Sequence, residues 1–145
     1  MSKSIYEQIY NQKITILNKL KRVDSPDGKL DVWYKHTVDN AVWYEDSARN
    51  SGGNGVYIGT YITVMIPFND DYLDYRDWKN LQDKNSKFTM SSGDYIVLGN
   101  VPETITASNV IETMKTYEGN YCMVKHIKRP HKRFNAKVQL MIEGV

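Results

Sequence analysis

The residues of this chain that could carry out chemistry are few and lie far apart. Cys122 is the single cysteine, so neither an internal disulfide nor a zinc site built on a thiolate pair is available. Its apolar neighbours in a predicted strand favour a packed thiol over a nucleophile. His126 and His131 are separated by a proline and have no cysteine nearby, which disfavours a shared metal ion. We therefore assign no residue to catalysis, to a metal or to a cofactor.

Acidic residues gather in one short segment and raise the question of calcium. The segment lacks both the loop glycine and the bidentate glutamate of an EF-hand, so a solvated acidic face is the favoured interpretation. The residues of this face are Asp70, Asp71, Asp74 and Asp77. The pair Glu45-Asp46 could serve a glycosidase, but a sequence does not fix the distance between two carboxyl groups. Because the chain also has no Gly-x-Ser-x-Gly elbow and no glycine-rich loop leading into a helix, we expect it not to be an enzyme.

The densest charge is a basic stretch at residues 125–137, which holds six of the 19 Lys and Arg residues and two of the three histidines. Five acidic residues lie between Asp70 and Asp83, so the molecule has oppositely charged regions. Such regions can join copies of one subunit head to side, or present a positive face to phosphate. A solvated turn and a surface that faces DNA or an acidic partner are both open interpretations. The turn comprises Lys128, Arg129, His131, Lys132 and Arg133.

A long strand at residues 56–68 is the element around which the chain is organised. Its β-branched and aromatic residues alternate with a period of two, which indicates a strand with both faces largely covered. Pro67 ends it, because proline has no N–H for the ladder. The glycine-rich segment before it has no residue able to anchor a core, so we expect a mobile loop that places the working surface at one end of the β-framework. This loop consists of Arg49, Asn50, Ser51, Gly52, Gly53, Asn54 and Gly55.

Shorter strands flank the long one, and their close turns favour antiparallel neighbours. Strands are predicted at residues 14–20, 32–38, 41–45, 88–90, 95–101, 121–128 and 136–142. The second and third are either separate or one bulged strand around Asp39-Asn40. Turns are expected at 24–28 and at 91–94, and the second of these closes a hairpin. Trp33 and Trp43 are interpreted as core or rim aromatics.

Two short helices are predicted to lie on the sheet. The first falls in 69–81, where aromatic residues recur at intervals of three and form a stripe. The second spans 107–117 and ends at Gly119-Asn120. Its capping box and apolar side consist of Asn109, Glu112, Val110, Ile111 and Met114. Residues 1–12 form either a short docked helix or an arm that reaches a neighbouring subunit.

Size and composition fit one domain over residues 13–145, preceded by the segment 1–12. A chain of 145 residues can bury roughly two-thirds of its unfolded surface, and the net charge of +2 is too small to predict a nucleic-acid partner. No apolar run approaches the ~20 residues that span a bilayer, and the first residues lack the apolar core of a signal peptide. We expect a soluble protein made without export. Its fold is predicted to be mainly β with minor α: a small antiparallel β-barrel or sandwich with one or two short helices and a long flexible loop.

Several of these segments, taken in order, form a recognisable pattern. They are Ile14-Thr-Ile-Leu-Asn-Lys19, Thr37 to Trp43-Tyr-Glu45, the glycine-bearing loop, Tyr61 to Pro67, Trp78, Phe88-Thr-Met90, Ser92 to Gly99, and the basic segment leading into Lys137-Val138. In order and spacing they resemble small head–tail connector proteins of tailed bacteriophages of Gram-positive hosts, of the minor-capsid or head-closure (stopper) kind. The resemblance covers most of the chain from about residue 13 onward.

The resemblance implies a β-barrel subunit that forms a closed ring, a hexamer or dodecamer, in the virion neck. Such rings retain packaged DNA and give the tail a docking surface. The implied partners are a portal-side adaptor, a tail terminator or tail tube, and packaged DNA bound without sequence specificity; no membrane and no cofactor is implied. The loop at 49–55 would project toward the channel or a neighbouring ring. The basic turn at 128–133 would line the channel or contact an acidic neighbour, and the acidic residues at 70–77 would face another subunit.

Two alternatives remain. A tail terminator or tail-completion protein would also form a ring, and gene order would distinguish it from a stopper. A single-stranded nucleic-acid-binding barrel of the OB type needs aromatic residues that alternate with basic ones on one exposed strand face. Here the basic residues cluster at a turn, which weakens that alternative. Affinity for an oligonucleotide that falls steeply with salt would favour it.

Overall fold

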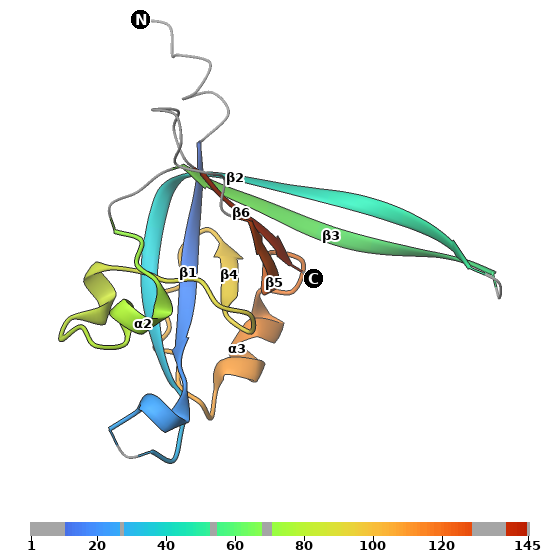
Figure 1. Cartoon of the computed structure of the whole chain (residues 1–145). Helices are drawn as coiled ribbons and strands as arrows, with labels where there is room; N and C mark the ends of the chain where they lie inside the picture. Colours follow the sequence, from blue (N-terminus) through green and yellow to red (C-terminus); the bar gives the residue numbers. More distant parts are fainter. Residues whose placement is uncertain (1–10, 27, 53–54, 68–70, 129–138, 145) are drawn as a thin grey trace, which may run out of the picture.

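The chain folds as a closed antiparallel β-barrel (Figure 1). The computed structural model describes residues 11–26, 28–52, 55–67, 71–128 and 139–144. Within them the strands are β1 (Gln12–Leu20), β2 (Val32–Gly52), β3 (Gly55–Pro67), β4 (Tyr95–Leu98), β5 (Tyr121–Lys128) and β6 (Gln139–Gly144). Around the barrel they follow the order β1-β2-β3-β6-β5-β4. The predicted mainly β fold is therefore confirmed. Of the predicted helix or arm at 1–12, residues 1–10 lie outside the described residues, and Gln12 already begins β1. Residues 136–138 of the predicted last strand also lie outside the described residues.

Two hydrophobic clusters hold the barrel together. The first is drawn from the barrel strands and the segment 88–90, and it consists of Ile14, Ile16, Val38, Ala41, Ile62, Val64, Ile66, Phe88, Met90, Ile96, Cys122 and Val124. The second lies between the strands and α3 (Val110–Thr116), and it consists of Leu17, Val97, Val101, Ile105, Val110 and Met114. Because successive strand residues face opposite sides, Ile16 and Leu17 belong to different clusters. β1 is thus buried on both faces.

β2 is one long strand with a bulge. Its pairing with β1 shifts between Gln12–Ala41 and Ile14–Val38, where β2 has one residue more than β1. Of the two sequence interpretations, the single bulged strand is confirmed. Trp33 and Trp43 are partly buried in β2 and pack against the second and first clusters respectively, as rim aromatics.

The predicted helix in 69–81 is confirmed as a single short turn, α2 (Tyr75–Trp78). Trp78 is fully buried and meets the ring of Tyr34 edge to face, with 5.6 Å between the ring centroids. The aromatic stripe therefore anchors this segment to β2, as expected. Two 3-10 turns complete the secondary structure of the described residues: η1 (Arg22–Asp24) and η2 (Lys84–Ser86).

The hairpin predicted from 88–90 to 95–101 is wrong. The turn at 91–94 exists, with Gly93 at φ +96°, but Phe88 pairs with the chain before α2 instead of with β4. Its N–H donates to the carbonyl of Asp71 over 2.9 Å, and its carbonyl accepts from the N–H of Leu73 over 2.9 Å. The next residue, Thr89, is bonded through both backbone groups to the side chain of Asn18, so the segment is not available to a regular ladder.

α3 is confirmed as a helix, but its predicted cap and apolar side are partly wrong. The Asn109 side chain bonds backward to the loop, with Oδ1 accepting from the N–H of Thr106 over 2.7 Å, and no capping box forms. Val110 and Met114 are buried, whereas Ile111 is 65% exposed. In a two-turn helix, residues four apart share one face and the residue next to them is turned away from it. The expected helix end is confirmed, with Gly119 at φ +88°.

Candidate functional site

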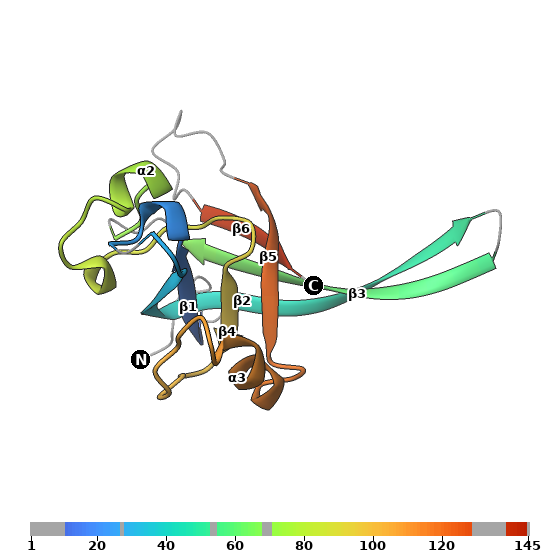
Figure 2. The ribbon, with the colours of Figure 1, turned by 90° about the horizontal axis from the view of Figure 1, so that it is seen from below.

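A two-stranded hairpin extends well beyond the barrel (Figures 1 and 2). β2 and β3 stay paired from Val42–Met65 out to Gly52–Gly55. β6 pairs with β3 only from Ile62 to Pro67, and β1 pairs with β2 only as far as Ala41. Residues 46–52 and 55–61 therefore form a ladder with no third strand among the described residues. We call this ladder the arm.

The arm continues a row of β3 that is buried inside the barrel. Ile62, Val64 and Ile66 occupy alternate positions and are all buried. By the same alternation, positions 56, 58 and 60 fall on that face of the ladder, and they carry Val, Ile and Thr. A β-hairpin without further strands is marginally stable in water.

The predicted loop at 49–55 forms the far end of the arm. Arg49 to Gly52 continue β2 and Gly55 begins β3, so the expectation of a long loop is wrong for these residues. Gly53 and Asn54 lie outside the described residues, and two intervening residues are the commonest connection of a β-hairpin. Polar residues and glycines are typical of loops, but here the β-branched and aromatic residues after Gly55 supply them with a strand partner. These residues lie at the end of the hairpin that is farthest from the barrel (Figure 1), and their working role stays a prediction.

Of the predicted acidic face, the structure describes Asp71, Asp74 and Asp77, and the role of this face stays a prediction. The carboxylate of Asp71 lies beside two basic side chains, 3.2 Å from Lys87 Nζ and 3.8 Å from His36 Nε2. Asp74 and Asp77 are exposed at the start of α2, and Asp70 lies outside the described residues. Among the residues described, no three or more His, Cys, Asp or Glu side chains are grouped so that they could hold a metal ion.

Of the predicted basic turn, the structure describes only Lys128, which ends β5. Arg129, His131, Lys132 and Arg133 lie outside the described residues, so their role stays a prediction. The strands on either side are antiparallel neighbours, with pairs from His126–Glu143 to Lys128–Met141. The turn therefore connects adjacent strands of the barrel wall, as the sequence indicated.

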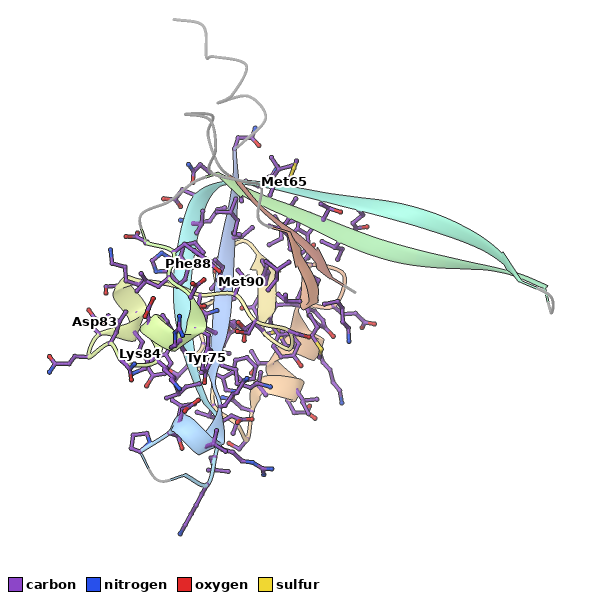
Figure 3. The ribbon with its side chains drawn as sticks, viewed as in Figure 1. Met65, Tyr75, Asp83, Lys84, Phe88 and Met90 are labelled. Carbon is purple, nitrogen blue, oxygen red and sulfur yellow. The ribbon has the colours of Figure 1, made fainter. Side chains whose placement is uncertain are left out.

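A polar cluster that the sequence analysis missed joins α2 to η1. Tyr75 Oη accepts from the N–H of Lys21 over 3.1 Å and donates to Asp24 over 2.8 Å, and Lys79 Nζ lies 3.4 Å from the same carboxylate. Burial raises the pKa of Tyr75 to about 12, and the hydrogen bond from Tyr75 lowers the pKa of Asp24. In Figure 3, Tyr75 and Lys84 lie on the side of the barrel that α2 covers. Tyr75 and Asp24 are about fifty residues apart in the chain, so no local sequence pattern predicts their contact.

A second missed cluster surrounds Asp94, whose side chain is buried. Its Oδ2 accepts from Asn18 Nδ2 and from the N–H of Ser91, both over 3.0 Å, and its Oδ1 accepts from the N–H of Lys19 over 3.1 Å. Asn18 also bonds the backbone of Thr89, by donating over 2.6 Å and accepting over 3.1 Å. Burial raises the pKa of Asp94 from 3.8 to about 6. The cluster fastens the segment 88–94 to β1.

We expect the stabilising contribution of Asp94 to grow on acidification from pH 7 to pH 4.5. Because the pKa of the folded carboxyl lies above its ordinary value, the folded state binds the proton first, and the free energy of unfolding falls as the pH rises through the range from about 4 to 6. The shift corresponds to at most about 3 kcal/mol. Urea unfolding of the natural chain and of Asp94→Ala, each at both pH values, isolates this group. The difference in free energy of unfolding between the two proteins should be larger at pH 4.5 than at pH 7. A smaller difference at pH 4.5 would mean that the three N–H donors stabilise the carboxylate more than burial destabilises it.

Cys122 is fully buried in β5, and burial raises the pKa of its thiol to about 12. The interpretation as a packed thiol is confirmed. In the part of the chain that the structure describes, no helix has the length and apolar character required to cross a membrane.

The model of one protein family matches residues 9–141, and its description is a family of unknown function (DUF6751). The match includes the whole arm, the strands β1 to β5 and the first part of β6. No significant match is found among curated proteins or among solved structures.

Proposed function

Because the chain belongs to this family of unknown function, we propose its role from its own structure: it is a ring-forming head–tail connector of a virion neck, of the stopper or head-closure kind. In this role it retains packaged DNA and provides a docking surface for the tail. It is made in the host cytoplasm and works in the assembled virion. The proposal is for a structural protein and involves no catalytic step.

The observation that carries the proposal is the arm. Its two strands lack a third strand among the described residues, and its β3 side continues a buried row of the barrel. An unpaired edge of this kind invites other chains to pair with it, which natural proteins avoid by covering the edge. In a closed ring of identical subunits, every arm meets the same surface of the next subunit, and all arms are covered. A ring would therefore give the arm of every subunit the same partner surface.

The two ends of the barrel also suit a ring placed between different neighbours. In Figure 1 the root of the arm lies at one end of β1, and η1 lies at the other. A portal-side adaptor at one end and a tail terminator or tail tube at the other would each meet a different surface. Packaged DNA would pass through the channel, with the basic turn at 128–133 as the proposed contact. The segments that support the resemblance also fall in neighbouring strands, since 14–19 lies in β1, 37–45 in β2 and 61–67 in β3.

We expect the purified full chain to form closed rings in negative-stain electron microscopy, with a mass from sedimentation velocity equal to six or twelve subunits. The arm supplies the contact that repeats around the ring. A chain that stays monomeric at high concentration, and also in a mixture with its neck neighbours, would remove the basis of the proposal. A tail terminator would form rings as well, and labelled micrographs of the virion separate the two roles, because a terminator sits on the end of the tail.

A further inference from the structure

Four neighbouring strands present aromatic and lysine side chains on the face that turns away from the barrel interior. In the closed barrel these strands follow the order β2-β1-β4-β5. Directly paired residues share one face of a sheet. Trp33 is paired with Lys19, and Lys35 is paired with Leu17. Leu17 is paired in turn with Tyr95 of β4. Since Leu17 belongs to the cluster between the strands and α3, this set of residues faces outward.

Three aromatic rings of this face form a continuous row. The ring centroids of Trp33 and Tyr95 are 5.5 Å apart, and those of Tyr95 and Tyr121 are 5.9 Å apart. The row therefore reaches from β2 across to β5. Leu17 and Val97, which pack in the cluster with α3, are buried, whereas all three rings of the row remain partly exposed. We call this row the aromatic row.

Lysines stand at both ends of the aromatic row. Lys19 Nζ lies 5.9 Å from the centre of the Trp33 ring, within the range of a cation–π contact. The exposed Lys125 follows Tyr121 in β5. No acidic residue occupies the strand positions of this face, which are the odd-numbered residues of 15–19, 33–37, 95–97 and 121–125.

Two carboxylates act on the lysines of this face. Glu103 attracts Lys35, whose Nζ also donates to two backbone carbonyls over 2.9 Å each, so this lysine is engaged in the fold. The carboxylate of Asp94 attracts Lys19, but Asp94 is buried and accepts hydrogen bonds from three N–H donors. Lys19 and Lys125 are therefore the cations that the aromatic row offers to a ligand.

We propose that this face binds single-stranded nucleic acid, with bases stacked on Trp33 and Tyr121 and phosphates beside Lys19 and Lys125. Every base has an aromatic face, so stacking on protein rings tolerates any sequence, and basic side chains attract the backbone. The bases of a single strand can be splayed onto such rings, whereas those of a duplex stay stacked on one another.

The combination of rings and lysines on one strand face is the feature that an OB-type binding barrel needs. The sequence does not show it, because the residues come from four strands that are distant in the chain. The aromatic row lies outside the arm, so this inference goes beyond the proposed ring and does not depend on it.

Fluorescence anisotropy of labelled oligonucleotides tests the inference on the full chain. Oligo(dT) and oligo(U) of about twelve nucleotides fall within the roughly 4–16 nucleotides that one OB fold covers. We expect a single strand to bind at low salt, with an affinity that falls steeply as salt is added. The stronger of the two ligands shows whether the 2′-hydroxyl contributes. A duplex of the same length should bind at least about fivefold more weakly, which corresponds to the stacking of one base.

Variants of the aromatic row separate stacking from charge. Trp33→Ala should weaken binding at least about fivefold, whereas Trp33→Phe keeps a ring and should retain most of the affinity. Tyr121→Ala, at the other end of the row, repeats the test without changing Trp33. Lys125→Gln should reduce the slope of log affinity against log salt by about 0.7, as expected for one phosphate contact of a single strand. Circular dichroism checks that each variant is folded.

Arg76→Gln is the matched control for charge, because Arg76 is an exposed cation on α2, which lies on a different side of the barrel from α3 (Figures 1 and 2). It should leave both the affinity and the slope unchanged. The proposal is overturned if no single strand binds at low salt, or if the duplex or polyglutamate binds as tightly as the single strands. It is also overturned if folded Trp33→Ala and Tyr121→Ala keep the natural affinity, or if Arg76→Gln reduces the slope as much as Lys125→Gln does.

Discussion

Replacing residues 47–60 by the dipeptide Asn-Gly is expected to abolish ring assembly and to leave the barrel folded. The pairs that remain next to the cut, Asp46–Tyr61 and Glu45–Ile62, continue into the part of β3 that pairs with β6. In an antiparallel ladder, hydrogen-bonded and non-hydrogen-bonded residue pairs alternate. Asp46–Tyr61 and Gly52–Gly55 are an even number of residues apart along β2, so they are pairs of the same kind, and two residues separate Gly52 from Gly55 in the chain. Asn-Gly suits such a two-residue connection. The variant therefore removes the arm without changing the register of the barrel.

Sedimentation velocity and negative-stain micrographs should show monomers for this variant where the natural chain shows rings, and circular dichroism should show a similar melting temperature for both. A milder variant serves as the control: Asn-Gly in place of residues 51–56 also closes on a pair of the same kind, Asn50–Tyr57, and keeps most of the arm. It should weaken assembly less than the full deletion. Rings of normal mass from the chain without its arm would contradict the assembly role of the hairpin.

Asp94→Ala is expected to lower the free energy of unfolding by about 3–5 kcal/mol at pH 7. The substitution leaves the N–H groups of Lys19 and Ser91 and one N–H of Asn18 without their acceptor, and each buried polar group that loses its partner costs roughly 1–3 kcal/mol. Folded domains are stable by only about 5–15 kcal/mol in total, so the loss is severe. Asp94→Asn should also destabilise the fold, because an amide can accept at one of the two positions and faces a donor at the other.

Urea unfolding with the linear extrapolation measures this loss. Asp83→Ala is the matched control, since Asp83 is an exposed acidic residue whose side chain accepts one hydrogen bond, from the N–H of Asn85 over 3.2 Å. Its removal should cost about 1 kcal/mol or less, as expected for a capping residue. If both substitutions cost the same, the network around Asp94 is not a principal restraint on the segment 88–94.

Local patterns predicted the strands well where the alternation of residue types agreed with the glycine and proline residues that flank the strand. The strand at 121–128 was predicted with its observed bounds, and Pro67 ends β3 as expected. Helix ends were also predictable where glycine is needed, as at Gly119. These features depend on residues that are near one another in the chain, so a single sequence contains the information that specifies them.

The features that were missed depend on partners distant in the chain. The residues of segment 88–90 suit a strand and so predict a hairpin, yet Asn18, seventy-one residues earlier, holds Thr89 in another conformation. The candidate site shows the same limit. Residues 49–52 alone did not indicate that a strand partner would extend them into an arm.

The continuity of β2 has a mechanical consequence. Its first half belongs to the barrel wall beside β1, and its second half is one strand of the arm. In Figure 1 the arm leaves the barrel at a steep angle to β1, so a force along the arm would act across the β1–β2 ladder and be resisted first by the pairs at its end, Gln12–Ala41 and Ile14–Val38. Since β1 is itself packed on both faces, the tension would be carried into the whole barrel. The arm is thus anchored in the packed barrel and not in a single pair of strands.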